Sequence, residues 1–141
     1  MGKTSIEWAT DSWNPIRARN KETGKVGWWC SKIAPGCAHC YAETMNLLRG
    51  NGVRYADDQA DKVDIFLDEK MLAEPLRWRK PRRVFVCSMT DLFHERISDA
   101  MIADVFNIMA SATLSCGKRH EHEDECWQGD QHTFLVLTKR P

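Results

Sequence analysis

Two short apolar runs stand out in the second half of the chain, at residues 83–87 and 133–138. Continuous apolar runs of this length are typical of strands that are buried on both faces of a sheet. Between them, Ser98 begins a segment whose apolar residues recur on one helical face: Met101, Ile102, Val105, Phe106 and Met109. A strand, a helix and a strand in this order predict a right-handed parallel crossover.

The chain opens with an alternating segment that is followed by a polar one. Apolar and aromatic positions alternate in residues 4–16, which predicts a first strand that Pro15 ends or kinks. Residues 17–36 are polar and contain the breakers Gly24 and Gly27. We therefore expect a long loop after the first strand.

The middle of the chain carries two further helical signals with a strand between them. Three side chains recur at helical spacing and predict a shared apolar face: Tyr41, Met45 and Leu48. Residues 63–67 alternate like a short strand, and Asp68 stands where it can cap a second helix. The whole pattern, four strands joined by three helices, predicts a single α/β domain over residues 1–141.

Composition and charge narrow the class of protein. The chain has 141 residues, which is enough for one domain with a real core. Lysine plus arginine balance aspartate plus glutamate at 20 each, so no overall field favours nucleic acid or an anionic membrane. The apolar runs are too short to cross a bilayer, and no signal-like segment opens the chain. We expect a cytoplasmic protein.

Three cysteines form the most informative group in the sequence. Cys30, Cys37 and Cys40 follow the spacing C-x6-C-x2-C, which is ligand-like, and cytosolic thiols are normally reduced. Three thiolates from one loop can bind three irons of a four-iron cluster and leave the fourth iron open for a small molecule. The same thiols completed by His39, or by another histidine, would instead suit zinc. The spacing alone leaves both metals open.

Four motifs occur in order along nearly the whole chain: S-I-E-W-A-T-D-S-W-N-P-I, P-G-C-A-H-C-Y-A-E, V-F-V-C-S-M-T-D-L-F and H-T-F-L-V-L-T-K-R-P. With these motifs the chain resembles the phage Gp37/Gp68 family (the DUF5131 proteins). That family is similar to radical S-adenosylmethionine (SAM) enzymes. The resemblance implies an α/β fold, a partial (half) TIM-like parallel β/α barrel of the radical-SAM type. It also implies a 4Fe-4S cluster on the cysteine triad, with S-adenosylmethionine at the open iron and a substrate that stays unknown.

The chain departs from the family pattern in two respects. Relatives continue beyond T-K-R-P, whereas this chain stops at Pro141. Four strands cannot close a parallel barrel. We therefore expect an N-terminal part of such a barrel, either a fragment or a half-barrel whose open edge is covered by a partner or a second half. Whether it is an active enzyme stays open.

Residues 111–131 are expected to form an inserted loop that carries a second group of metal-binding residue types. The candidate ligands lie within eleven residues: Cys116, His120, His122 and Cys126. Two thiols and two imidazoles can hold zinc in a tetrahedral site. The alternative is a solvated acidic loop, because carboxylates interleave these residues.

Polar residues at the ends of the two buried strands are the candidate ligands for the cofactor, because parallel α/β folds bind ligands there. Ser88 and Asp91 could hydrogen-bond a ribose or an amino group, while Lys139 and Arg140 could contact a carboxylate or a phosphate. Turn chemistry for Asp91 and solvated charge for the basic pair are the alternatives. Tyr41 or His39 could pack over the cluster.

Two other functions remain open from the sequence. A shortened, metal-stapled half-barrel would suit a non-catalytic phage binding protein, such as an inhibitor of a host defence system, or a zinc-binding module. Residues 77–83 place five cations around Trp78 and could bind a nucleic-acid backbone. Favourable charge at the end of a helix explains that stretch more simply, since the net charge is zero.

Overall fold

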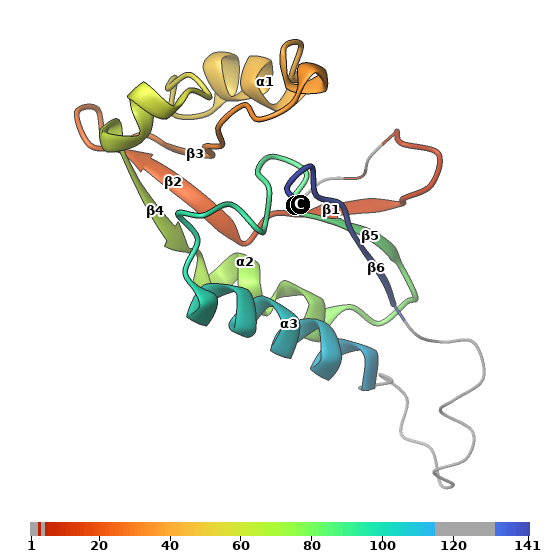
Figure 1. Cartoon of the computed structure of the whole chain (residues 1–141). Coiled ribbons are helices and arrows are strands. Elements are labelled where there is room, and N and C mark those ends of the chain that lie inside the picture. Colours follow the sequence, from red (N-terminus) through yellow and green to blue (C-terminus); the bar gives the residue numbers. More distant parts are fainter. Residues whose placement is uncertain (1–2, 4, 115–131) are drawn as a thin grey trace, which may run out of the picture.

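The computed structural model describes residue 3, residues 5–114 and residues 132–141. Its parallel sheet has the strand order β1-β5-β6 (Figure 1). Strand β5 (Arg83–Val86) pairs with β1 (Asp11–Trp13) on one side and with β6 (Thr133–Val136) on the other. The two apolar runs of the second half are thus neighbouring parallel strands, as predicted.

A second, antiparallel sheet is built from the segment after Pro15. Strand β2 (Ile16–Asn20) lies between β3 (Val26–Gly27) and β4 (Val63–Leu67). The prediction of a long loop over residues 17–36 was therefore wrong at its start, because Pro15 separates two strands instead of ending one. Strand β4 was predicted as a strand, but it pairs antiparallel with β2 and does not extend the parallel sheet. Within the described residues the parallel sheet has three strands. The half-barrel stays a prediction.

Three α-helices and three short 3-10 helices complete the described structure. The α-helices are α1 (Tyr41–Arg49), α2 (Glu69–Ala73) and α3 (Asp99–Leu114), and the 3-10 helices are η1 (Pro35–Cys37), η2 (Asp57–Lys62) and η3 (Glu74–Arg77). Asp68 caps α2 as predicted, because its carboxylate accepts from the backbone N–H groups of Lys70 and Met71. Among the described segments no helix combines the length and the apolar character that a membrane crossing needs.

Two buried clusters divide the molecule. One lies between the parallel sheet and helices α2 and α3, and it includes Trp13, Val84, Val86, Leu92 and Val105. The other lies between the antiparallel sheet and α1, and it includes Ala18, Trp29, Val53, Tyr55 and Val63. In Figure 1, α2 and α3 lie together on one side of the strands, whereas α1 lies beside β3 at the opposite end. The cysteine loop belongs to the second cluster and faces the ends of the parallel strands.

The predicted apolar face of α1 is not its buried face. Tyr41 and Leu48 are 64% and 75% exposed, and the helix instead buries Ala42 and Asn46. Hydrogen bonds of Asn46 determine which face is buried. Its side chain accepts from the Trp28 backbone N–H at 2.9 Å and donates to the Val53 carbonyl at 2.9 Å. A buried amide with these partners fixes the helix more specifically than an apolar contact would.

Asn51 extends the same network to the antiparallel sheet. Its side-chain oxygen accepts from Asn46 at 2.8 Å, and its side-chain nitrogen donates to the carbonyls of Ala18 and Trp28 at 3.0 Å each. Gly27 is required here, since a Cβ at this position would clash with the backbone nitrogen of Asn51 and with the side-chain oxygen of Asn46. The network therefore ties β2, β3 and α1 together on both sides of the cysteine loop.

Candidate functional site

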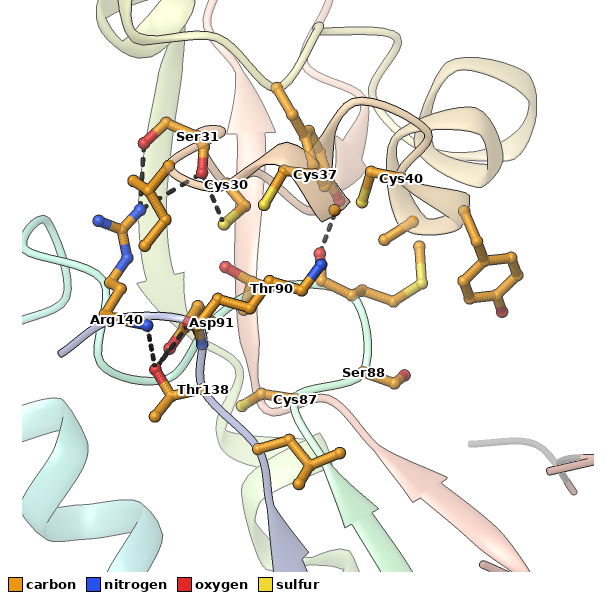
Figure 2. Close-up of a pocket in the computed structure, with 18 of the residues that line it drawn as sticks. Cys30, Ser31, Cys37, Cys40, Cys87, Ser88, Thr90, Asp91, Thr138 and Arg140 are labelled. Carbon is orange, nitrogen blue, oxygen red and sulfur yellow. Dashed lines mark hydrogen bonds between the residues drawn. The ribbon is translucent and has the colours of Figure 1, made fainter. Parts of the chain in front are cut away.

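A cavity of about 540 Å³ lies between the cysteine loop and the ends of β5 and β6 (Figure 2). This volume is within the range of small-molecule sites, about 300–1,000 Å³. Its lining brings together every residue that the sequence assigned to the cluster and the cofactor: Cys30, Cys37, Cys40, Tyr41, Ser88, Asp91 and Lys139. Residues more than one hundred positions apart thus meet at one site.

Local backbone structure presents the three cysteines to the cavity. Pro35 begins η1, which is a favourable place for a residue without an N–H, and the Cys37 N–H donates to the Ala34 carbonyl at 2.9 Å. Cys40 has an extended backbone and immediately precedes α1. Figure 2 shows the labelled Cys30, Cys37 and Cys40 along the same side of the cavity. All three are free thiols, as is Cys87 across from them.

The thiols differ in how readily they ionise. Burial would raise the pKa of Cys37, but backbone hydrogen bonds from Ile33 and Ala34 and the nearby Lys139 ammonium outweigh it, and the pKa is lowered. Burial raises the pKa of Cys30, which Arg140 only partly offsets. Lys139 and Arg140 both stabilise the thiolate form. Because a thiol loses its proton when it binds a metal, the two cations also favour metal binding at the site.

The described side chains contain no group of three histidine, cysteine or acidic residues that could hold one metal ion. In a four-iron cluster each thiolate binds a different iron, so the three sulfurs surround the cluster instead of a single ion. The donor set and the cavity fit such a cluster in this respect.

The residues after β5 carry a backbone feature that is rare outside glycine. Cys87 has φ of 55°, in the left-handed region, and its N–H donates to the Trp13 carbonyl at 2.8 Å. This turn aims the Cys87 thiol and Ser88 in different directions (Figure 2). Ser88 accepts from the Asn14 amide at 3.0 Å. Cys87 is buried, which raises its pKa to about 12, so it acts as a small apolar residue.

Asp91 joins the loops that follow β5 and β6. Its carboxylate accepts from the Thr138 hydroxyl at 2.8 Å, from the Lys139 backbone N–H at 3.0 Å and from the Phe93 N–H at 3.0 Å. Turn chemistry therefore occupies both oxygens in the absence of a ligand, and direct contact with a cofactor stays a prediction. Lys139 extends from this loop to Gly36 on the cysteine loop. A Cβ added to Gly36 would lie 3.5 Å from the Lys139 ammonium.

Comparison with known proteins tests the family resemblance of the chain. A family described as "Protein of unknown function (DUF5131)" matches residues 3–141. The chain belongs to the DUF5131 family. No curated protein and no solved structure matches this DUF5131 chain, so the match itself brings no activity with it.

The DUF5131 site also contains a buried polar cluster that the sequence did not indicate. Ser31 and His94 are 3% and 2% exposed, and the Ser31 hydroxyl lies 2.9 Å from His94 Nε2. His94 Nδ1 accepts from the Arg96 backbone N–H at 3.0 Å, so the proton is on Nε2 and donates to Ser31. Arg140 donates to the Ser31 hydroxyl at 3.2 Å. Both ring nitrogens of His94 therefore have hydrogen-bond partners within the fold.

Two further bonds tie the cysteine layer of the DUF5131 chain to the strand ends. The Tyr55 hydroxyl donates to the Met89 carbonyl at 2.7 Å, and Thr90 donates to the Trp29 carbonyl at 2.6 Å. No motif pointed to Tyr55, because a lone tyrosine in a loop carries no spacing signal. Glu43 in α1 is partly buried and bridges the Lys32 ammonium and the Tyr55 backbone N–H.

The remaining predicted sites fall outside the cavity or outside the described residues. Cys116, His120, His122 and Cys126 lie in the segment 115–131, which the structure does not describe, while residues 111–114 belong to α3. In the basic stretch, Arg82 covers the Trp78 ring at 4.8 Å and forms an ion pair with Asp11 at 3.2 Å. Trp78 also packs against His132 and Phe134, so its ring is engaged within the fold.

Proposed function

We propose that this DUF5131 chain is a radical-SAM-like iron–sulfur protein of phage Gp37/Gp68 type. In the proposal, Cys30, Cys37 and Cys40 hold a 4Fe-4S cluster, and S-adenosylmethionine binds beside it. One observation carries the proposal: three free thiols from one loop and the polar ends of two parallel strands line a single cavity. When bound and reduced, the cluster would supply the electron that cleaves a C–S bond of S-adenosylmethionine to give a radical.

The chain's own residues would bind and shield the cofactor. Lys139 and Arg140 carry the positive charge at the cavity and suit the carboxylate of S-adenosylmethionine. Arg140 Nε is a buried donor that has no partner among the described residues, which leaves it free to bind such a group. Tyr41, 64% exposed at the rim, can cover the bound cofactor.

The test is turnover of S-adenosylmethionine by anaerobically reconstituted protein with dithionite as reductant. We expect 5′-deoxyadenosine from the wild type, none from Cys37→Ala, and an undiminished yield from Cys87→Ala, which removes a thiol from the same cavity outside the triad. Production of 5′-deoxyadenosine by the Cys37→Ala variant would contradict the assignment of the triad.

A second candidate function, a non-catalytic binding protein or host-defence inhibitor, is favoured by the edge of the parallel sheet. Among the described strands β6 pairs only with β5, and the apolar side chains of Leu137, Phe93 and Phe106 are exposed near it. An exposed strand edge can accept a further strand from a partner. A stable complex with a host protein that survives in the Cys30→Ser, Cys37→Ser, Cys40→Ser variant would favour this function over the enzymatic one.

A further inference from the structure

A second cavity, of about 390 Å³, adjoins the cysteine cavity. The two cavities share Tyr41, Ser88 and Met89 as lining residues. Ser88 lies on the boundary, because Figure 2 shows its hydroxyl pointing away from the Cys87 thiol, and it is bonded to Asn14 in the second cavity. A ligand that fills the second cavity would therefore lie next to whatever the cysteine cavity holds.

The charge of the second cavity is entirely positive. Arg17 and Arg49 are its charged lining residues, and no carboxylate belongs to the lining. Arg17 shares its charge with Asp68 through a single long contact of 3.5 Å. The Arg49 side chain makes no hydrogen bond or ion pair to any part of the chain that the structure describes. A concave site with two guanidinium groups, only one of which is paired with a carboxylate, attracts anions.

Two buried donors in this lining have no partner. Arg17 Nε and the indole N–H of Trp28 are both buried, and neither forms a hydrogen bond within the described residues. The Arg17 guanidinium lies over the Trp28 ring at 5.3 Å, so the two donors belong to one rigid unit. An unsatisfied buried donor is unfavourable, because it has lost its contact with water without gaining a partner. Such donors beside a cavity are explained by an acceptor that binds there.

We propose that the second cavity binds the phosphate group of a phosphorylated organic substrate. Two arginines suit a dianion, and guanidinium forks match phosphate oxygens in geometry. The rest of the ligand would lie on the apolar wall formed by Met45, Met71 and Met89, which can adapt to different shapes. From there it would reach past Tyr41 towards the cysteine cavity. That the ligand extends towards the cysteine cavity rests on the proposed function, whereas phosphate binding in the second cavity does not.

The test is titration of the full chain, as purified anaerobically, with inorganic phosphate followed by ³¹P NMR. We expect Arg49→Gln to weaken binding about tenfold, because it removes one charge-assisted contact worth about 1.4 kcal/mol. Arg49→Lys should keep part of the affinity. Arg79→Gln, which removes an exposed arginine outside both cavities, should leave it unchanged.

Two results would overturn the phosphate site. One is wild-type phosphate affinity in the Arg49→Gln variant, which should fold normally because Arg49 is exposed. The other is displacement of phosphate by acetate at equal concentration, which would point to a carboxylate ligand. The same samples separate the two proposals, since phosphate binding without an iron–sulfur cluster would refute only the proposed function. A cluster with no phosphate binding would refute only this inference.

Discussion

At the scale of single residues, the pKa of each thiol in the site depends on its burial and on the cation beside it. Lys139 lies near Cys37, and Arg140 lies near Cys30, yet the pKa values of the two thiols shift in opposite directions: burial prevails at Cys30, whereas hydrogen bonds and the Lys139 charge prevail at Cys37. The pKa of Cys87 is raised further by burial, so this thiol stays protonated. Three chemically identical side chains in one cavity thus have different pKa values.

The pKa shifts predict an order of alkylation in the metal-free protein. The pH midpoint for reaction with iodoacetamide should be lower for Cys37 than for Cys30, because only the thiolate reacts. Mass spectrometry of peptides alkylated across a pH series gives both midpoints. Lys139→Gln should raise the Cys37 midpoint, whereas Lys80→Gln, a change of the same type outside the cavity, should not. A lower midpoint for Cys30 than for Cys37 would contradict the account.

At the scale of elements, the buried pair Asn46 and Asn51 positions α1 relative to the antiparallel sheet. Asn46→Ala removes the partner of the Trp28 N–H and of the Val53 carbonyl in a fully buried place. We expect the free energy of unfolding to fall by about 2–4 kcal/mol. Urea denaturation measures it. Asn107→Ala, at an exposed position of α3, should change it by less than about 0.5 kcal/mol.

The sequence predicted elements well where one physical signal dominated. The apolar runs of β5 and β6 and the Asp68 cap are of this kind. Strand β2 was missed because its outward side chains are cations, which pack over aromatic rings from distant parts of the sequence. Arg17 lies over Trp28, and Arg19 lies over Phe66 at 5.2 Å. No local pattern reveals such contacts.

The buried face of α1 was predicted wrongly for a related reason. Apolar spacing selected Tyr41, Met45 and Leu48, but the helix is held by the Asn46 amide, whose partners come from two other segments. The members of the candidate site could nevertheless be predicted, because cysteine spacing and strand ends are local signals. Ser31, Tyr55 and His94 could not, since their roles arise only when the chain folds.

At the scale of the whole molecule, two buried histidines link folding to pH. His94 and His132 each accept a backbone N–H at Nδ1, from Arg96 and Arg82 respectively, and burial lowers the pKa of both. The unfolded chain therefore binds more protons than the folded one at mildly acidic pH. Stability from these histidines is complete above their unfolded pKa of about 6.5 and is lost as the pH falls towards their lower folded pKa values.

We therefore expect the free energy of unfolding to decrease as the pH is lowered from 7.5 to 5.5. The slope from each histidine cannot exceed about 1.4 kcal/mol per pH unit. Urea denaturation of the metal-free protein across this range measures it. His94→Asn with His132→Asn should flatten the dependence, while His39→Asn, at an exposed position, should leave it in place. A free energy of unfolding that increases on acidification would contradict the neutral state assigned to His94 and His132 in the folded protein.

The most direct test of the central claim is the iron, sulfide and zinc content of the protein purified without oxygen. The account predicts about four irons and four sulfides per chain, as a 4Fe-4S cluster requires, and their loss when Cys30, Cys37 and Cys40 are changed to serine together. The matched Cys87→Ser variant should retain both. A wild-type chain that contains stoichiometric zinc, with neither iron nor sulfide, would contradict the claim.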